Sequence, residues 1–235
     1  MNFLKWAICV GIFLVIFYIG IYIYYRHKVE KEEHFSKKYS IEELLEKVDN
    51  GDVILFCSRK LSYWKPLATV WTKTPFLHAA IVSKTSTEKP SLYHFGSVSY
   101  GCGVEPKWPQ RSKNLFYSDF EEFILNHKKE NDSFIKLFKA PKNNWDINDA
   151  AENLVDFEYC NKWTKLIFKG YNREQSDEKG IMNCCSFIGQ IFEELGLIDT
   201  EKVTHPFSNY SPQNLPKMLS ELDFFESENI DVKIR

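Results

Sequence analysis

The longest apolar pattern in the chain lies at its N-terminus, where residues 6–25 (WAICVGIFLVIFYIGIYIYY) carry no charged side chain. About twenty apolar residues in a helix are enough to cross the hydrocarbon core of a bilayer. A cleaved signal peptide is the competing interpretation, but its apolar region is shorter and a small-residue cleavage site follows it. Here Arg26, His27 and Lys28 follow instead. The pattern therefore predicts an uncleaved transmembrane anchor over residues 1–25.

Basic residues flank this anchor unequally. Lys5 is the only basic side chain before it, whereas the stretch after it contains Arg26, Lys28, Lys31, Lys37 and Lys38. Because cytoplasmic flanks carry the excess of Lys and Arg, this bias predicts that the larger C-terminal part lies on the cytoplasmic side. Residues 26–39 are charged and show no apolar periodicity, so we expect a juxtamembrane linker there and one folded domain over residues 40–235.

Short apolar runs and helically spaced apolar positions alternate along residues 40–235. Ser40 followed by Glu43 is a capping-box pattern that predicts a helix over residues 40–48. Further helices are predicted over residues 117–128, from 145 toward 160 with a cap at Asp146 or Asn148, and from about Asn183 to Gly196. Residues 205–219 are predicted to be irregular, with a short terminal helix after them. Strands are predicted over residues 53–57, 74–84, 91–98, 103–108 and 133–140. This order predicts an α+β domain in which the His-bearing strands precede the Cys-bearing helix.

The composition agrees with a folded domain rather than a disordered chain. Hydrophobic residues make up 44% of the 235 residues and charged residues 26%, as is usual for globular proteins. The formal charge of −2 supplies no basic surplus to neutralise phosphates, so a nucleic-acid partner is not expected. The six cysteines, at positions 9, 57, 102, 160, 184 and 185, show no CxxC spacing, which indicates reduced thiols rather than a disulfide framework.

Two stretches carry residues suited to covalent chemistry. FLHAAIVSK (residues 76–84) has His78 near its start, and NCCSFIGQIFEELG (residues 183–196) has a cysteine pair near its start. A thiol is a strong nucleophile only as the thiolate, and a helix N-terminus or a nearby imidazolium lowers its pKa. Cys184 stands where the helical run begins, and His78 could supply the imidazolium. His94, on the next predicted strand, could orient the ring of His78 if the two side chains share one face.

Spacing alone leaves structural interpretations of these residues open. A histidine near a strand start commonly makes a structural hydrogen bond, and Cys185 in an apolar helix is suited to core packing. The cysteines interpreted as structural are Cys57, Cys102 and Cys160. A zinc site would draw on His78, His94, Cys102 and Cys184, but no close ligand pair anchors it. Glu105, or an Asn or Gln, is an alternative to His94 as the orienting group.

The order of the motifs resembles one known family. GDVILF, LHAAIV, LYHFGS, GVEP and, much later, NCCSFIGQIFEELGL stand in the order found in the circularly permuted branch of the NlpC/P60 papain-like superfamily. That branch includes bacterial YiiX-like proteins, lecithin:retinol acyltransferase-like and HRAS-like suppressor acyltransferases, and relatives in large DNA viruses. The resemblance spans about residues 49–218, and SPQNL (residues 211–215) is similar to a motif near the end of YiiX-like chains. Residues 107–180 match no motif of the branch.

The resemblance implies a papain-like antiparallel sheet with packed helices and a Cys-His(-His) site. His78 falls on the general-base position, His94 on the orienting position, and Cys184, directly after Asn183, on the nucleophile. The doublet makes Cys185 an alternative nucleophile. Such a site implies acyl transfer on an ester or amide bond without a cofactor or metal, and the anchor suggests a membrane lipid or an acylated substrate as the partner. A peptidase or amidase of the same fold, and a catalytically inactive membrane-anchored structural protein of viral type, are the alternatives.

Overall fold

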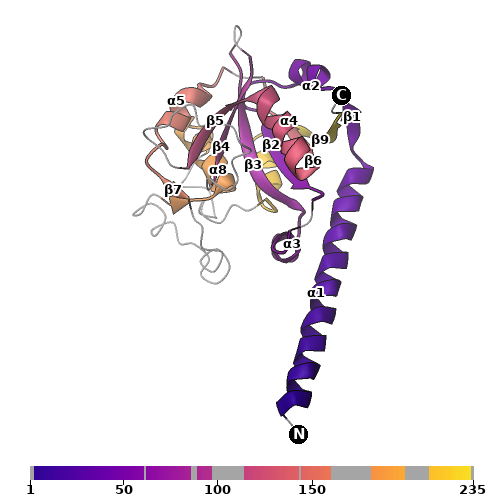
Figure 1. Cartoon of the computed structure of the whole chain (residues 1–235). Coiled ribbons are helices and arrows are strands. Elements are labelled where there is room, and N and C mark those ends of the chain that lie inside the picture. Colours follow the sequence, from indigo (N-terminus) through magenta and orange to yellow (C-terminus); the bar gives the residue numbers. More distant parts are fainter. Residues whose placement is uncertain are drawn as a thin grey trace.

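The computed structural model describes residues 3–60, 62–85, 89–96, 114–142, 144–159, 181–198 and 212–233. A long N-terminal helix projects from a rounded domain (Figure 1). The helices are α1 (Phe3–His34), α2 (Ile41–Lys47), α3 (Lys65–Thr72), α4 (Phe120–Asn131), α5 (Ile147–Glu152), α8 (Cys184–Glu194) and α9 (Leu215–Glu221). The strands are β1 (Lys37–Tyr39), β2 (Val53–Ser58), β3 (Phe76–Ser83), β4 (Ser91–Phe95), β5 (Leu115–Asp119), β6 (Ser133–Lys139), β7 (Glu158–Tyr159), β8 (Ile181–Met182) and β9 (Phe225–Val232).

Seven strands form one mixed sheet in the order β1-β9-β6-β2-β3-β4-β5. Neighbouring strands are antiparallel, except that β1 and β9 run parallel. The short strands β7 and β8 form a separate parallel pair. The central strands β2 and β3 are apolar along nearly their whole length, which suits strands covered on both faces. The predicted α+β class is confirmed.

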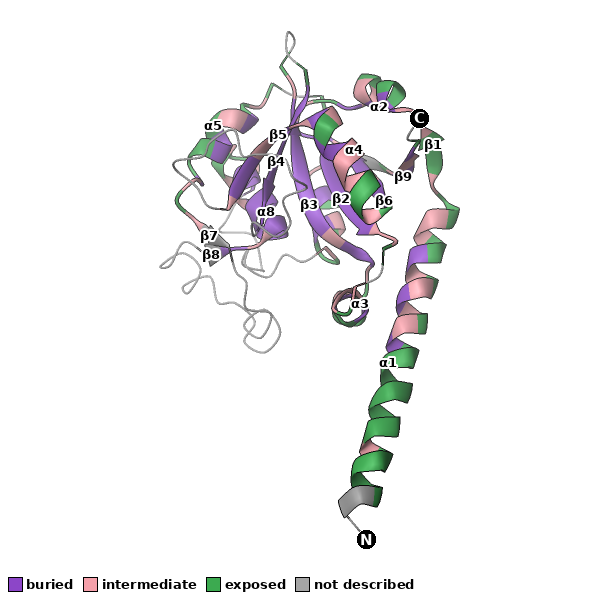
Figure 2. Ribbon diagram, in the orientation of Figure 1, coloured by how far each residue is buried: buried purple, intermediate pink, exposed green. Residues whose placement is uncertain are grey.

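Helices cover both faces of this sheet, so the domain has two cores (Figure 2). Helices α5, α8 and α9 pack on one face with Val53 and Leu55 of β2. Helices α2 and α4 pack on the other face with Ile54 and Phe56 of the same strand. Because side chains alternate along a strand, β2 contributes to both cores in turn. Cys184 belongs to the first core, on the α8 face.

Helix α1 runs without a break through the segment predicted to be a linker. Ile21, Tyr25 and Val29 are buried along one side of it, and the hydroxyl of Tyr25 donates to the carbonyl of Ser58 at 2.6 Å. The prediction of a linker over residues 26–39 is therefore wrong at the level of secondary structure, because this segment is helical to His34 and then forms β1. Apolar residues four apart form a stripe beneath the charged positions. By length and composition, α1 is long and apolar enough to cross a membrane.

The remaining elements agree with the predictions in part. The capping box of Ser40 and Glu43 is present at the start of α2. Predicted strands are confirmed at β2, β3, β4 and β6, and predicted helices at α4, α5 and α8. The terminal helix predicted after residue 219 is wrong in position, because α9 begins already at Leu215 and the chain beyond it forms β9. However, α4 begins only at Phe120, because residues 117–119 complete β5, and α5 ends at Glu152. Helix α3 and the strands β5, β7, β8 and β9 were not predicted. The strand predicted over residues 103–108 lies outside the described residues.

Candidate active site

Cys184 is the first residue of α8, and the turn around it is held by side-chain caps. The extended backbone of Asn183 places its Oδ1 where it accepts hydrogen bonds from the backbone N–H groups of Cys185, at 2.8 Å, and Ser186, at 3.0 Å. The hydroxyl of Ser186 accepts in return from the backbone N–H of Asn183 at 2.7 Å. This capping box fixes the helix start, whose partial positive charge favours a thiolate at Cys184.

His78 and His94 lie on adjacent antiparallel strands and contact each other. His94 is in register with Ala80, so His78, two residues earlier on β3, stands diagonal to it on the same face. Nε2 of His78 lies 3.2 Å from Nδ1 of His94. The ring of His94 is almost fully buried and packs against the rings of Phe116 and Phe123, with centroids 5.0 and 4.7 Å away. The second imidazole is therefore held in one place behind the first.

The thiol of Cys184 reaches His78 at the end of the β3–β4 pairing. The N–H of Val82 donates to the carbonyl of Asp52 on the β2 side, so strand alternation directs the N–H of Ala79 toward β4. The β3–β4 register starts only at Ala80, one residue later. The sulfur of Cys184 accepts this N–H of Ala79 and also makes a hydrogen bond with His78. Helix α8 thus presents its thiol from one face of the sheet to an imidazole that extends from the other.

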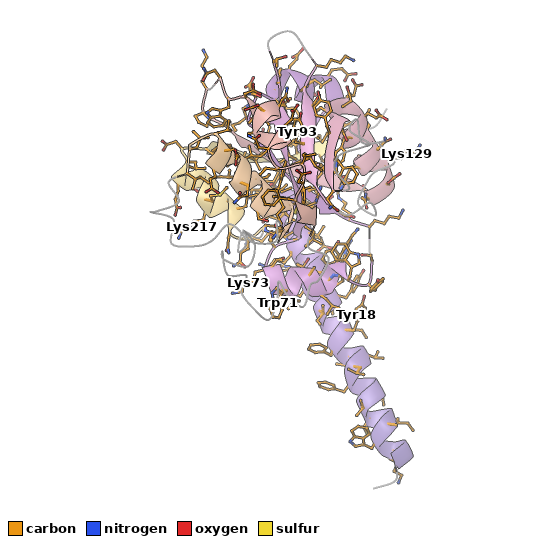
Figure 3. All side chains as sticks on the ribbon, turned by 90° about the vertical axis from the view of Figure 1, so that its left-hand side faces the viewer. Tyr18, Trp71, Lys73, Tyr93, Lys129 and Lys217 are labelled. Carbon is orange, nitrogen blue, oxygen red and sulfur yellow. The ribbon has the colours of Figure 1, made fainter. Side chains whose placement is uncertain are left out.

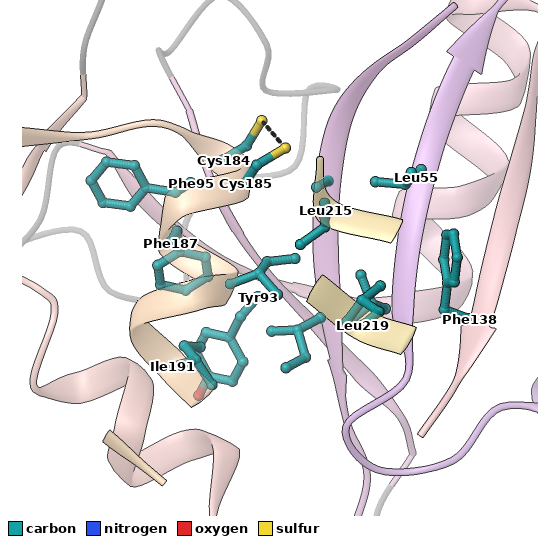
Figure 4. Packing of buried hydrophobic residues seen from close by; sticks show 14 of the residues in the cluster. Leu55, Tyr93, Phe95, Phe138, Cys184, Cys185, Phe187, Ile191, Leu215 and Leu219 are labelled. Carbon is teal, nitrogen blue, oxygen red and sulfur yellow. Dashed lines mark hydrogen bonds between the residues drawn. The ribbon is translucent and has the colours of Figure 1, made fainter. Parts of the chain in front are cut away.

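The two neighbouring cysteines have opposite acid strengths. A hydrogen bond from the thiol of Cys185 is the largest factor that lowers the pKa of Cys184 well below its usual value; the contact with His78 and the N–H of Ala79 act in the same direction, against burial. Burial and the neighbouring Cys184 raise the pKa of Cys185 well above its usual value. The sulfur atoms are 3.9 Å apart at the start of α8 (Figure 4). This arrangement favours Cys184 as the thiolate and Cys185 as its protonated donor.

Burial keeps His94 in the neutral form. Its pKa lies well below the usual value because of burial first, and then because a charge on its ring would be repelled electrostatically by any charge on the neighbouring rings of His78 and His127. A neutral imidazole has one unprotonated nitrogen. Nδ1 of His94 can therefore accept the Nε2–H of a protonated His78, and Nδ1 of His78 is then the nitrogen left for the sulfur of Cys184.

A third histidine, His127 on α4, extends this group, and sequence reasoning missed it. Burial, followed by the charges of His78 and Lys65, lowers the pKa of His127 to about 3. Its Nδ1 lies 2.7 Å from the hydroxyl of Ser133, and its ring lies beside Phe56. The sequence signal was weak: His127 follows Phe123 by one helical turn and so points to the same sheet face. His127 is neutral and adds to the buried environment that keeps His94 uncharged.

Other candidates drawn from the sequence do not join this site within the described residues. Glu105, Cys102 and Cys160 lie outside those residues. In the part of the chain that the structure describes, no group of three or more His, Cys, Asp or Glu side chains is arranged to hold a metal ion. Cys57 is a buried free thiol, and burial raises its pKa, as for an unreactive core cysteine. The described part of the site is thus a thiol and two histidines.

Comparison of the chain with protein-family models and with curated proteins found no match. A functional assignment therefore depends on the chemistry of the residues around Cys184.

Proposed function

We propose that this protein is a membrane-anchored cysteine hydrolase or acyltransferase that acts on an ester or amide bond. The observation that carries the proposal is the hydrogen-bonded chain from Cys184 to His78 to His94. A thiolate, a base that holds it and a group that orients the base are what nucleophilic acyl transfer requires. The same three residues carry the resemblance to the circularly permuted NlpC/P60 papain-like superfamily, and we propose that this chain is a member.

The proposed reaction runs in two steps. The thiolate of Cys184 attacks the carbonyl carbon, the C–O or C–N bond breaks, and protonated His78 gives its proton to the leaving oxygen or nitrogen. Neutral His78 then takes a proton from water or from an acceptor alcohol or amine. That nucleophile attacks the thioester and frees the thiol. His94 orients His78 in both steps and stabilises its charged form.

One backbone group is suited to hold the oxyanion of each tetrahedral intermediate. The side chain of Asn183 takes up the N–H groups of Cys185 and Ser186, so the first-turn donor that this cap does not engage is the N–H of Cys184. This N–H group belongs to the same residue as the proposed nucleophilic sulfur and points outward from the start of α8. A donor of this kind contributes about 10²–10³ in rate in a well-studied protease.

The proposed location is a membrane crossed once by α1, with the domain on the cytoplasmic side. The excess of basic residues after the apolar segment supports this orientation. The described cysteines of the domain, Cys57, Cys184 and Cys185, are free thiols, which suits a reducing compartment. A domain held at a bilayer has lipid esters and acylated proteins as its nearest substrates, so we propose one of these as the acyl donor.

The full chain reconstituted in phospholipid vesicles tests this proposal. Wild type is expected to release fatty acid or lysophospholipid, or to transfer an acyl group to an added amine, as followed by mass spectrometry. Cys184→Ser and His78→Ala should abolish this turnover, and Cys57→Ser is the matched control that should keep it. Turnover of peptide amides alone would identify a peptidase or amidase instead. No turnover of either class, with slow alkylation of Cys184, would identify a non-catalytic protein.

A further inference from the structure

Helix α3 turns an apolar face outward. Leu67, Val70 and Trp71 share one side of this helix and are 49%, 42% and 53% exposed, while Pro66, Ala68 and Thr69 are buried on the other side. Tyr63, in the turn before the helix, is 79% exposed. Grouped apolar side chains on a surface mark a place of interaction. We call Tyr63, Leu67, Val70 and Trp71 the α3 face.

The α3 face lies beside the apolar part of α1. The hydroxyl of Tyr18 on α1 donates to the carbonyl of Tyr63 at 3.5 Å. Figure 1 shows α3 on the side of the domain that faces the N-terminal half of α1, and Figure 3 shows Trp71 near the level of Tyr18 along that helix. The two apolar surfaces are therefore neighbours at one end of the domain.

The domain itself sets how far lipid can surround α1. From Ile21 onward one side of the helix is buried against the domain, whereas the large apolar side chains from Trp6 to Ile19, apart from the half-buried Val10, are exposed. The helix from Phe3 to Gly20 is about 27 Å long at 1.5 Å per residue. This length is close to the hydrocarbon thickness of about 30 Å. A bilayer that covers this part of α1 ends near Tyr18, which is the level of the α3 face.

We propose that the α3 face is a second membrane contact, which lies in the headgroup region of the same bilayer that α1 spans. This inference rests on the proposed membrane anchoring of α1. Tyr and Trp side chains favour that region, and the exposed Lys73 at the end of α3 is placed to meet lipid phosphates. A bilayer is the occupant that the position favours, because the apolar surface of α1 continues into this face.

The second contact fixes the domain relative to the lipid. Because α1 enters the domain without a flexible linker, and α3 contacts the bilayer beside it, the domain has little freedom to tilt. Strand β3 begins directly after α3, at Phe76, and carries His78. The end of β3 that bears the proposed general base is thereby held toward the membrane, which suits an acyl substrate drawn from the bilayer.

Tryptophan quenching in vesicles of the full chain tests this contact. Vesicles are made from phosphatidylcholine brominated on the acyl chain near the headgroup, and the emission of Trp71→Phe is subtracted from that of wild type. The expected result is that the Trp71 emission is lost in brominated vesicles and is shielded from aqueous iodide. Quenching by iodide without quenching by bromolipid would overturn the proposal. Shielding from iodide without bromolipid quenching would also overturn it, because a protein would then cover the face.

Matched variants separate the possible failures. The emission of Trp6, obtained from Trp6→Phe, reports insertion of α1; if bromolipid quenches neither Trp6 nor Trp71, the anchoring fails and the docking with it. Trp145 is partly buried and packs against Phe192 and Phe224 at the edge of the core. Its emission, obtained from Trp145→Phe, should not be quenched by bromolipid. Leu67→Glu should reduce lipid turnover but leave the alkylation rate of Cys184 unchanged. If Leu67→Glu reduced lipid turnover and the alkylation rate of Cys184 equally, the α3 face would not act only by positioning the domain on the membrane.

Discussion

Nε2 of His78 lies 3.2 Å from Nδ1 of His94, and the pKa of His94 is held well below its usual value. The group behind the proposed base is therefore a neutral acceptor rather than a carboxylate. A neutral imidazole accepts a hydrogen bond from His78 without adding a charge of its own. The proposed ion pair between the thiolate of Cys184 and the imidazolium of His78 would then be stabilised chiefly by hydrogen bonds around each partner.

Replacing His94 tests its orienting role. His94→Ala removes an acceptor for a charged donor, which is worth about 1.5–3 kcal/mol, so turnover should fall by roughly one to two orders of magnitude. His94→Gln, whose amide oxygen can accept the same bond, should restore part of the loss. The pKa of Cys184 should rise in His94→Ala because the imidazole of His78, one of the groups that lower this pKa, is no longer held in place. Unchanged turnover and an unchanged pKa of Cys184 would assign His94 to packing alone.

Cys185 should behave as a donor and not as the nucleophile. Cys185→Ala removes the largest factor that lowers the pKa of Cys184, so that pKa should rise, and turnover near neutral pH should fall by about tenfold or less for one weak bond. Cys185→Ser, which keeps a donor, is the matched control and should lose less. Turnover measured at several pH values gives the pKa of Cys184 and the loss of activity in each variant. Complete loss in Cys185→Ala with activity retained in Cys184→Ser would exchange the two roles.

Asp52 should be a structural residue rather than part of the site. It is fully buried and accepts from the backbone of Asp49 and Ala140 and from Lys139, with distances of 2.7–2.8 Å. Asp52→Ala leaves these donors unsatisfied and should cost about 3–5 kcal/mol of unfolding free energy, measured by urea denaturation. Thiol reactivity of the folded fraction should stay normal. If Asp52→Ala lost thiol reactivity while its unfolding free energy stayed equal to that of wild type, the structural role of Asp52 would be contradicted.

The same carboxyl should influence stability as pH changes. Burial raises the pKa of Asp52 in the folded state, against the opposing bonds from Lys139 and the backbone. The folded protein then binds this proton more tightly than the unfolded chain, so ionisation from about pH 4 upward lowers the unfolding free energy. As pH rises from about 4, the unfolding free energy of wild type should therefore fall relative to that of Asp52→Asn. A relative gain would show that the pKa is lowered instead.

Tyr25 should be the residue that fastens α1 to the domain. It is 1% exposed, and its hydroxyl donates to Ser58. Tyr25→Ala should cost about 3–5 kcal/mol, as for other buried aromatic residues, whereas Tyr25→Phe removes one hydrogen bond and should cost about 1 kcal/mol. Hydrogen exchange of the full chain in detergent measures the effect. Equal protection of residues 21–34 in all three proteins would contradict this role.

Local sequence signals predicted a large part of the fold because they act over a few residues. The caps at Ser40, Asp146 and Asn183 were readable, since each needs only one polar side chain before an apolar helical run. The apolar strands β2 and β3 were equally plain. Strand β9 was missed because its residues are mostly polar, and it is a strand only because β6 and β1 pair with it. Helix α3 was missed because its apolar residues face outward.

The site itself was predictable only in part. Position in the chain indicated Cys184 and His78, but only the register between β3 and β4 places His94 beside His78. The contribution of Ala79 depends on which way a backbone N–H points, and that of Cys185 on a sulfur-to-sulfur contact. Neither leaves a pattern in the sequence. The linker prediction failed because the buried stripe of Tyr25 and Val29 becomes visible only when the domain lies against it.

The most direct test of the proposed thiolate–imidazolium pair is the pH dependence of alkylation by iodoacetamide in the full chain, mapped by mass spectrometry. Cys184 is only 6% exposed, so a small reagent is needed. Wild type should label at Cys184 with an apparent pKa well below the usual value of about 8.5, and the rate should stay high until pH falls through that pKa. In His78→Ala the apparent pKa should rise and labelling at neutral pH should slow. Labelling at Cys185 instead, or the same profile in both proteins, would contradict the proposed site.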